Sequence, residues 1–409
     1  MRRLCALVLA VSTMLGGCFL VTKQAVSLYT DHAEFAAYVE LYNSAQTEYK
    51  VELGYAEAPF RILEESSVVP DLIIGKWLAN EPLLQGFDTL DGLLTSQKIS
   101  RESFYPDLLA LGAHEQEVHL LPVSFNLPAV VLDVDLAQET DNPIVIGLEE
   151  MRTLSERFNQ KKGEMTNVGF SPLWDADFFY YIGRLFGAQF RAAEDQVLAW
   201  NDLELQRSVD FVRAWIDEIN DGIEVERRFI GKYFTVPPYT LVADGRIMFY
   251  LASSAGFAAL SEEKRAVLDF RWLSHEKKIP VQEGILWTGI PLAARNKEGA
   301  KSFLVWLFSQ ETQRRLLEVN SHKRLRVFGI ANGFSALPEI NERDLPEQHA
   351  FFLGHIPGAG FLQFPPRLPT EWERLKREVV QQRYFEHIVE GTDVSLEVLV
   401  ESWIRQNVR

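Results

Sequence analysis

Cysteine is almost absent from this chain of 409 residues, which has only Cys5 and Cys18. If residues 1–17 are removed on export, as argued below, Cys18 is the single cysteine left and no internal disulfide can form. The fold must therefore depend on its apolar core. Hydrophobic residues make up 47% of the chain, which is ample for packed cores and argues against disorder. The length suggests two domains or one large domain.

Basic residues are scarce relative to acidic ones: 41 Lys and Arg stand against 57 Asp and Glu, for a net charge of −16. A nucleic-acid-binding protein needs a basic surface for the phosphates, so we expect no nucleic acid partner. The same charge argues against adsorption of the body of the protein to anionic lipid. Beyond the N-terminal segment, no apolar run approaches the roughly 18 residues that a membrane-spanning helix needs.

Recognisable catalytic and metal-binding motifs are missing as well. The sequence has no G-x-S-x-G elbow, no Walker loop and no H-E-x-x-H, because the His114-Glu115 pair lacks the second histidine. The eight histidines are scattered without ligand spacing. We therefore expect no metal, no cofactor and no catalytic residue. Two carboxylates flanking a glycosidic bond would leave no sequence signature, so a hydrolase stays open as an alternative.

The N-terminus has the pattern of a targeting segment. Two arginines precede an apolar stretch at 4–14, which has the length of a signal-peptide core. Leu-Gly-Gly-Cys follows at 15–18 and resembles the lipobox of bacterial lipoproteins, in which the cysteine is lipidated and becomes the first mature residue. We expect 1–17 to be a signal peptide, Cys18 to be lipidated and 18–25 to be a tether that holds the protein outside the cytoplasmic membrane, in the periplasm or at the cell surface. A plain cleaved signal is the alternative.

A stretch with two prolines, 120–135, divides the chain. Its start, 120–123, indicates a short buried strand, and 129–135 indicates a second extended run. Pro122 and Pro128 each lack a donor for the ladder, so neither is expected inside a central strand. We predict a strand that leaves one sheet, crosses over and enters another, which gives two lobes with a cleft between them. An ordinary strand–loop–strand is the alternative.

The first part of the chain alternates strands with a helix. Apolar or alternating runs predict strands at 25–28, 49–55 and 70–75. The helix after the first strand repeats apolar residues at i, i+3, i+4 and i+7, and Asp31 with Glu34 forms a candidate capping box. Parallel strands joined by helices are typical of a doubly wound α/β fold.

Two more candidate crossings follow in the second half of the chain. The first, 284–295, is small, apolar and punctuated by glycine, and the second, 320–338, is loop-like. Asn296 is placed to cap the helix after the first of these. Thr370 and Glu373 form a candidate capping box at the start of a helical tail.

The order and spacing of these features resemble an extracellular solute-binding protein of an ABC importer, in the large family that includes the maltose-binding proteins. The resemblance rests on the Leu15–Cys18 lipobox, Pro70–Gly75 followed by Trp77, Leu121–Pro128, Ala243–Met248, and Gly289–Ala293 with Asn296–Ala300. It covers nearly the whole mature chain. Arg246 and Ile247 depart from the family, which usually has a small residue before the methionine that follows.

The resemblance implies a type II periplasmic-binding-protein fold: an α/β chain with two doubly wound lobes joined by crossing strands and a ligand cleft between them. One lobe would comprise 26–126 and 285–320, and the other 127–284 and 321–409. It also implies that the protein is not an enzyme. A carbohydrate, either a sugar or an oligosaccharide, would be captured outside the membrane and delivered to ABC permease subunits by hinge closure. We expect a monomer.

The ligand is expected at the carboxyl ends of the strands, where open α/β sheets bind their ligands. The loops at these ends pair an aromatic residue with an amide, hydroxyl or carboxylate, which is the combination that a sugar ring and its hydroxyls require. The candidate ligand-binding residues are Tyr29, Asp31, Trp77, Phe125, Asn126, Trp174, Asp175, Ser253, Trp287, Thr288 and Gly289. Trp287 is the strongest candidate because its neighbours are small. Trp77 and Trp174 fit lobe packing equally well, and Asp31 also fits a helix cap.

The residues leave two other functions open: binding of a non-sugar ligand, either a polyamine or a peptide, and hydrolysis of a glycoside. Asp31, Asp175 and Asp177, with Trp77, Trp174 and Trp287, could build an acidic aromatic box for a polyamine. A peptide is a further non-sugar ligand. A lipid-anchored glycoside hydrolase is the enzymatic alternative.

Overall fold

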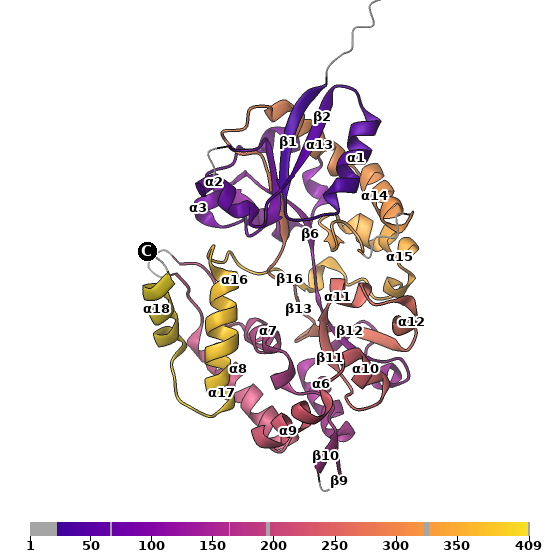
Figure 1. Cartoon of the computed structure of the whole chain (residues 1–409), viewed down its shortest axis with the longest axis vertical. Coiled ribbons are helices and arrows are strands. Elements are labelled where there is room, and N and C mark those ends of the chain that lie inside the picture. The colour runs from indigo at the N-terminus through magenta and orange to yellow at the C-terminus, as the bar shows by residue number, and fades with distance from the viewer. Residues whose placement is uncertain (1–22, 66–67, 163, 194–196, 323–326, 408–409) are drawn as a thin grey trace, which may run out of the picture.

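The computed structural model describes residues 23–65, 68–162, 164–193, 197–322 and 327–407. Within these ranges the chain forms two lobes, one above the other in Figure 1, and each lobe is built around its own sheet. No helix in the described ranges is long and apolar enough to cross a membrane. The predicted signal peptide, 1–17, and the predicted lipidation site, Cys18, lie outside the described residues.

The first lobe contains a six-stranded mixed sheet. Strand β1 is parallel to β2 and β3, whereas β14 is antiparallel to β3 and β6, and β15 is antiparallel to β6. The order is β15-β6-β14-β3-β1-β2, with β1 at Gln24–Thr30, β2 at Tyr49–Tyr55, β3 at Leu72–Lys76, β6 at Leu121–Phe125, β14 at Leu286–Gly289 and β15 at Phe334–Ser335. The three strands predicted in the first part of the chain are confirmed, as is the α/β class.

The longest helices of this lobe follow the predicted apolar pattern. Helix α1 (Phe35–Ala45) buries its apolar face, but the predicted capping box is wrong, because Glu34 is the N-cap residue and makes no side-chain cap. Asp31 instead pairs with the ring of His32. Asn296 caps α13 as predicted, and its side chain accepts from the N–H of the third helical residue at 3.0 Å. The other elements of the lobe are α2 (Ile62–Glu65), α3 (Glu81–Leu84), α4 (Asp91–Thr95), α5 (Pro106–Leu111), β4 (Ala113–His114), β5 (Glu117–Val118), α13 (Lys297–Leu307), α14 (Gln310–His322) and α15 (Leu345–Gln348).

The second lobe contains a four-stranded sheet of order β11-β7-β12-β8. Strand β7 is antiparallel to both of its neighbours, and β8 is parallel to β12. The strands are β7 (Pro128–Asp133), β8 (Val145–Gly147), β11 (Tyr250–Ser253) and β12 (Leu268–Ser274), with a separate hairpin of β9 (Gln160–Lys162) and β10 (Glu164–Asn167). The helices are α6 (Leu148–Phe158), α7 (Ala176–Phe186), α8 (Asp202–Ala214), α9 (Ile223–Tyr233), α10 (Pro238–Ala243), α11 (Ser254–Ala258), α12 (Glu262–Arg265), α16 (Trp372–Leu375), α17 (Phe385–Val389) and α18 (Leu396–Asn407), with π-helical segments η5 (Trp215–Ile219) and η9 (Lys376–Tyr384).

The first predicted crossing is confirmed. Strand β6 belongs to the six-stranded sheet, and β7, which starts after Asn126 and Leu127, belongs to the four-stranded sheet. Pro128 is the first residue of its strand, a position where no ladder donor is needed. Pro122, however, lies inside β6, contrary to our expectation. It is tolerated because β15 pairs only with the last two residues of β6 and because the ladder to β14 shifts register opposite the proline.

A second crossing exists but lies mostly before its predicted range of 284–295, and the third also lies elsewhere. The chain passes from β12 in the second lobe through β13 (Ile279–Pro280) to β14 in the first lobe. The crossing predicted at 320–338 is wrong, because β15 within that range still pairs with β6. The sheet membership of β15 therefore also differs from the predicted lobe boundary at residue 321. The third crossing runs from the end of α15 to the start of α16, residues 349–371, and its strand β16 (Leu362–Gln363) pairs in parallel with β13.

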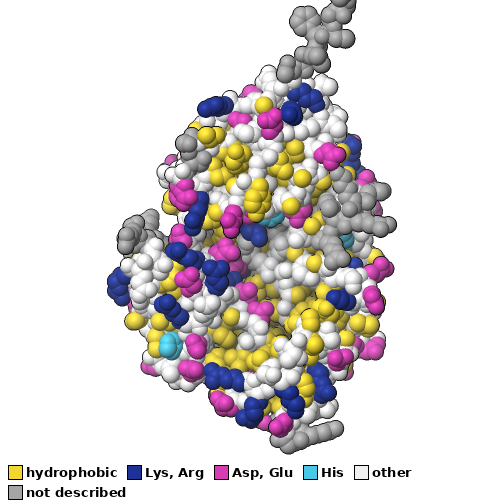
Figure 2. Space-filling model, viewed as in Figure 1, with side chains coloured by type: hydrophobic (Ala, Val, Ile, Leu, Met, Phe, Trp, Pro, Cys, Tyr) yellow, Lys and Arg dark blue, Asp and Glu magenta, His cyan; other side chains and the backbone are white. Residues whose placement is uncertain are grey.

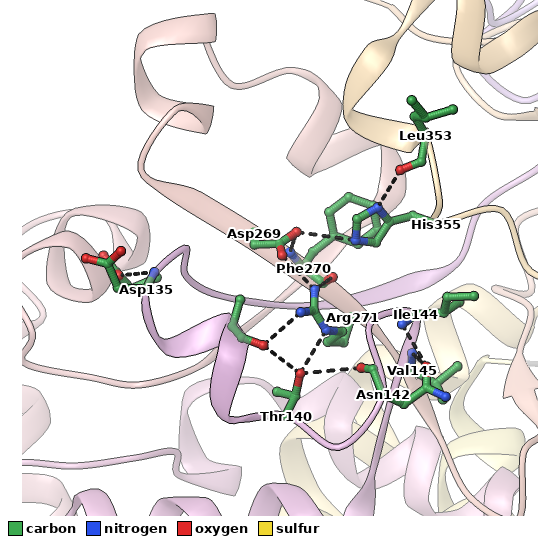
Figure 3. A network of polar contacts seen from close by, with 12 residues as sticks. Asp135, Thr140, Asn142, Ile144, Val145, Asp269, Phe270, Arg271, Leu353 and His355 are labelled. Carbon is green, nitrogen blue, oxygen red and sulfur yellow. Dashed lines mark hydrogen bonds and ion pairs between the residues drawn. The ribbon is translucent and has the colours of Figure 1, made fainter.

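A buried polar network anchors the third crossing to the second lobe (Figure 3). The carbonyl of His355 accepts from Nε1 of Trp272 at 2.6 Å, and its ring lies 3.4 Å from the carboxylate of Asp269. Arg271 donates to the same carboxylate at 2.7 Å and to Thr140 at 3.0 Å. Burial alone would raise the pKa of Asp269, but the hydrogen bonds from His355 and Arg271 outweigh it and lower this pKa to about 2. The carboxylate is therefore charged over the whole physiological range.

Candidate functional site

The surface between the two lobes is hollowed, with acidic and basic side chains along the border of the hollow (Figure 2). Two cavities lie there. The larger has a volume of about 530 Å³, within the range of small-molecule sites, and is lined by Glu57, Ala58, Phe60, Arg61 and Trp77 of the first lobe and by Thr370, Glu371, Glu373, Arg374 and Arg377 of the second. The smaller, of about 30 Å³, is lined by residues that include Trp77, Asn80, Glu283, Trp287 and Arg367. We call the larger one the interlobe cavity.

Trp77 is the residue that both cavities share. It directly follows β3, and its backbone has a φ of 64°, in the left-handed region that a bulky residue rarely adopts. Strain of this kind is retained where the surrounding structure holds it, and it is concentrated at ligand sites and switch regions. The half-buried indole reaches the other lobe, where its Nε1 donates to Oε2 of Glu373 at 3.0 Å. Trp77 therefore links the two walls of the interlobe cavity.

Glu373 reaches this position because it does not cap its own helix. The predicted capping box of Thr370 and Glu373 is wrong, since Glu371 is the N-cap residue of α16 and no side-chain cap forms. Because the carboxylate of Glu373 does not accept from a backbone N–H at the start of the helix, it accepts from the indole N–H of Trp77 instead. Both predicted box residues line the interlobe cavity.

A second link between the lobes runs through Arg367 in the third crossing. Its Nη1 lies 2.6 Å from Oε2 of Glu81 in the first lobe, and its Nη2 donates to the carbonyl of Ala113. Its own carbonyl accepts from the N–H of Ala192 in the second lobe at 2.9 Å. Glu81 also pairs with the ring of His114. These contacts hold the third crossing against both lobes at the small cavity.

The second crossing is held by a buried ion pair with the C-terminal helices. Lys376 lies 2.5 Å from Oδ1 of Asp177 and also pairs with Glu283 in the crossing. Gln381 donates to the same oxygen of Asp177 at 2.6 Å. Residues five apart lie about 140° apart around an α-helix. The π-helix η9 has i→i+5 geometry instead and brings Lys376 and Gln381 to one side. Burial opposes the charge on Lys376, but the two carboxylates outweigh it and raise the pKa of the lysine.

Trp174 and Asp175 directly precede helix α7 in the second lobe. The ring of Trp174 stacks against Phe229 at 6.0 Å between centroids and packs on Phe234 at 4.9 Å, so it belongs to an aromatic cluster of this lobe. The carboxylate of Asp175 caps α7 by accepting from the N–H of Asp177 at 2.8 Å. Burial, followed by the charge of Asp177, raises the pKa of Asp175 to about 6. Neither Trp174 nor Asp175 lines the two cavities described above.

A buried glutamate supports the loop that carries Trp174. Glu226 is 2% exposed, accepts from Nδ2 of Asn220 at 2.5 Å and is hydrogen bonded to the hydroxyl of Ser171. Ser171 in turn caps the short helix that ends at Trp174. Burial is the main cause that raises the pKa of Glu226 to about 7, and the two hydrogen bonds only partly oppose it. No arginine or lysine is among the groups that shift this pKa.

Tyr29 and Asp31, at the end of β1, serve local structure. The ring of Tyr29 lies against Gly54, where an added Cβ would come within 2.4 Å of the ring. The carboxylate of Asp31 is 2.6 Å from Nδ1 of His32. Neither Tyr29 nor Asp31 is among the residues that line the two cavities.

Phe125 and Asn126 form the first crossing itself. Phe125 is 2% exposed and packs against Tyr105 and Phe334, so the structure places it in the core and not at the cleft. Asn126 accepts from the hydroxyl of Ser254 at 2.5 Å and is thereby tied to the start of α11. Its side-chain amide thus joins the crossing to the second lobe, and its role in ligand binding stays a prediction.

The remaining predicted residues lie in strand ends or in the sheet. Ser253 caps α11 and accepts from the N–H of Gly256 at 2.9 Å. Thr288 is fully buried in β14, and Gly289 has no room for a Cβ, which would lie 2.4 Å from a leucine side chain. Both are therefore core positions. Trp287 is only 3% exposed, although one edge of it lines the small cavity.

The interlobe cavity thus contains several residues that the sequence did not suggest, namely Phe60, Arg61, Glu371, Arg374 and Arg377. Arg61 follows the carboxyl end of β2, and open α/β sheets bind their ligands at the carboxyl ends of strands. The two helical arginines carry no sequence signal, because an exposed arginine on a helix is ordinary. The predicted polyamine box does not assemble: of its residues, Trp77 and Trp287 reach the cavities, while Asp31 and Asp175 have local partners. Among the described residues, no group of three or more His, Cys, Asp or Glu side chains could hold a metal ion.

Comparison with solved structures identifies the fold. No protein-family model matches the sequence, and no curated protein matches it. The chain is similar to the sugar-binding protein MalE from Xanthomonas citri, with a TM-score of 0.66, 13% identity and coverage of 94% of this chain and 96% of that one. It is also similar to an ABC substrate-binding protein from Listeria monocytogenes in complex with cycloalternan (TM-score 0.64, 12% identity, 94% and 99% coverage). A third similar structure is a Thermus thermophilus maltotriose-binding protein bound with maltotriose (TM-score 0.56, 13% identity, 93% and 98% coverage). The chain has the two-lobed fold of these solute-binding proteins over nearly its full length.

Proposed function

We propose that this protein captures a carbohydrate outside the cytoplasmic membrane and delivers it to the permease of an ABC importer. The observation that carries the proposal is the interlobe cavity, which both lobes line and which contains the indole of Trp77 beside carboxylates, guanidinium groups and a hydroxyl. An indole face suits the C–H face of a sugar ring, and the polar groups suit its hydroxyls. The similarity in fold to proteins described as bound to maltotriose or cycloalternan supports the same ligand class.

Closure of the lobes is the mechanism we propose. Three crossings connect the lobes, and noncovalent contacts join them beside the crossings: Trp77 to Glu373 at the interlobe cavity and Arg367 to Glu81 near the small cavity. A ligand that contacts both walls binds the closed arrangement better than the open one and shifts the population toward it. The permease would then recognise the closed form. This role requires no catalytic residue and no cofactor.

We further propose that the protein acts at the membrane surface as a lipid-anchored monomer. The Leu15–Cys18 lipobox supports the anchor, and the net charge of −16 argues against any other adsorption to anionic lipid. The ABC permease subunits are the expected protein partners.

Isothermal titration with a panel of mono- and oligosaccharides tests the ligand class. Trp77→Ala removes a stacking face, on the order of 1 kcal/mol, and the burial of a large side chain, about 1.5–3 kcal/mol, so it should weaken binding by roughly tenfold to several hundredfold. Trp200→Ala is the matched control, since this half-buried indole also donates to a carboxylate, that of Asp202, but lines a different cavity. Binding of no saccharide, or equal effects of both substitutions, would refute the proposal.

A further inference from the structure

Three arginines converge on the interlobe cavity from both lobes. Arg61 lies on the wall from the first lobe, and Arg374 and Arg377, one helical turn apart, lie on the wall from the second. Lys and Arg side chains also gather along the border of the hollow in Figure 2. The same cavity has three carboxylates, those of Glu57, Glu371 and Glu373, so its arginines and glutamates are equal in number in a chain whose net charge is −16.

These three guanidinium groups lack close carboxylate partners. Arg61 is 3.9 Å from Glu65 and Arg374 is 3.6 Å from Glu371, both beyond hydrogen-bond distance. Arg377 has no ion pair or hydrogen bond among the described residues. The arginines elsewhere in the chain that hold a close partner include Arg101 at 2.8 Å, Arg152 at 2.7 Å, Arg271 at 2.7 Å, Arg314 at 2.8 Å and Arg367 at 2.6 Å. Unlike these five, the arginines of the interlobe cavity have no carboxylate of the described residues within hydrogen-bond distance.

Two of the three are nevertheless held in place by aromatic rings. Arg374 lies over the ring of Trp403 at 4.8 Å, and Arg61 lies near the ring of Phe60 at 5.6 Å. The Nε of Arg374 is buried and has no hydrogen-bond partner within the described part of the chain. A buried donor without a partner costs free energy, so an acceptor supplied by a ligand at this wall would be favourable. The fixed guanidinium plane also lowers the entropy lost on binding.

The three acidic residues of the cavity, Glu57, Glu371 and Glu373, equal its arginines in number but make no close ion pair with them. Glu373 accepts the N–H of Trp77, and Glu371 lies beside Arg374. Carboxylates at these positions can accept hydroxyl protons from a sugar ring, while the guanidinium forks match the two oxygens of a carboxylate or the oxygens of a sulfate or phosphate ester.

We propose that the interlobe cavity selects a saccharide that carries an acidic group, whose oxygens bind between Arg61 on one lobe and Arg374 and Arg377 on the other. The ring would stack on Trp77, and the acidic group would draw the two walls together on closure. This inference rests on the proposed function and names the class of sugar that the site takes.

The test compares three saccharides of equal length by titration calorimetry: a neutral one, one with uronic acid units and one with sulfate esters. We expect at least one acidic saccharide to bind more tightly than the neutral one. We also expect its affinity to fall as ionic strength rises, because part of the attraction is between charges. The uronate and sulfate arms identify which acidic group the cavity accepts.

Substitution of Arg377 adds the decisive comparison. Arg377→Gln removes a charge-assisted hydrogen bond and should weaken binding of the acidic saccharide by about tenfold to a hundredfold, and binding of the neutral saccharide by clearly less. The residue is exposed, so the variant should fold normally. Arg343→Gln, at a 68% exposed arginine on the first lobe, is the control and should change neither affinity. Tighter binding of the neutral saccharide, or equal losses for both ligands in Arg377→Gln, would overturn this inference and leave the proposed function standing. Failure of all three saccharides to bind would overturn both.

Discussion

Glu226 provides a sharp test of the structure because its carboxyl group is buried beside hydrogen-bond partners but no cation. The side chain is 2% exposed, and burial raises its pKa from about 4.5 to about 7. The folded state therefore holds a proton that the unfolded state releases. The stability that this proton gives is complete below the unfolded pKa and is lost as the pH rises through the folded pKa.

The size of the effect follows from the two pKa values. A difference of about 2.5 at 1.36 kcal/mol for each unit of pKa gives about 3 kcal/mol, lost between about pH 4.5 and about pH 7. Glu226→Gln keeps the shape and the hydrogen-bonding groups but cannot ionise. Asp175 also has a raised pKa and also lowers the free energy of unfolding as the pH rises. Because Asp175 is present in both proteins, it does not contribute to the difference in free energy of unfolding between them.

The assay is urea unfolding of the wild type and Glu226→Gln from about pH 4 to about pH 8. We expect the variant to gain about 3 kcal/mol on the wild type between the two ends of this range. Glu263→Gln, at an exposed position of α12, serves as the control and should follow the wild type. Parallel stability curves for the wild type and Glu226→Gln would refute the argument that this carboxyl group is buried without a compensating charge.

Three further predictions concern other parts of the molecule. Trp287→Ala should reduce the free energy of unfolding by roughly 3–5 kcal/mol because the indole is 3% exposed, while the affinity of the folded fraction stays intact. Melting temperature and ligand affinity measured on one sample separate these outcomes, and lost affinity at unchanged stability would contradict them. Cys18→Ala should release the mature protein from the membrane fraction without unfolding it, and a variant that still sediments with washed membranes would exclude the lipid anchor. Small-angle scattering should give a smaller radius of gyration with saturating saccharide than without, and an unchanged radius would count against closure.

The fold could be predicted in outline because its signals are local. The apolar face of α1 and the strands β1, β2 and β3 follow from periodicity, and the prolines at 122 and 128 indicated the first crossing. The third crossing could not be located, because β15 has only two residues and its pairing with β6 depends on contacts distant in sequence. The position of Pro122 inside β6 depends in the same way on which neighbours pair beside it.

The candidate site was harder to predict than the fold. Trp77 was expected at the cleft because it follows a buried strand, and the structure places it at the cavity wall. Phe125 and Thr288 were expected at the cleft for the same reason, but both are buried. Successive side chains of a strand point to opposite faces of the sheet, and the sequence alone does not say which face meets the other lobe. Arg374 and Arg377 reach the cavity only because the C-terminal helices pack beside the crossings, a long-range arrangement with no local signature.

The six-stranded sheet has a consequence for the order in which the chain can fold. It takes its strands from residue 24 to residue 335, and Tyr42 donates to Ser302, 260 residues away, at 3.0 Å. Contacts at such separation form slowly because much chain must be ordered before they are made. A chain that emerges N-terminus first therefore holds β1, β2 and β3 without β14 until residue 289 and without β15 until residue 335. The first lobe is therefore the first to be synthesised and among the last to be completed, and the export proposed above would act on a chain whose six-stranded sheet is still incomplete.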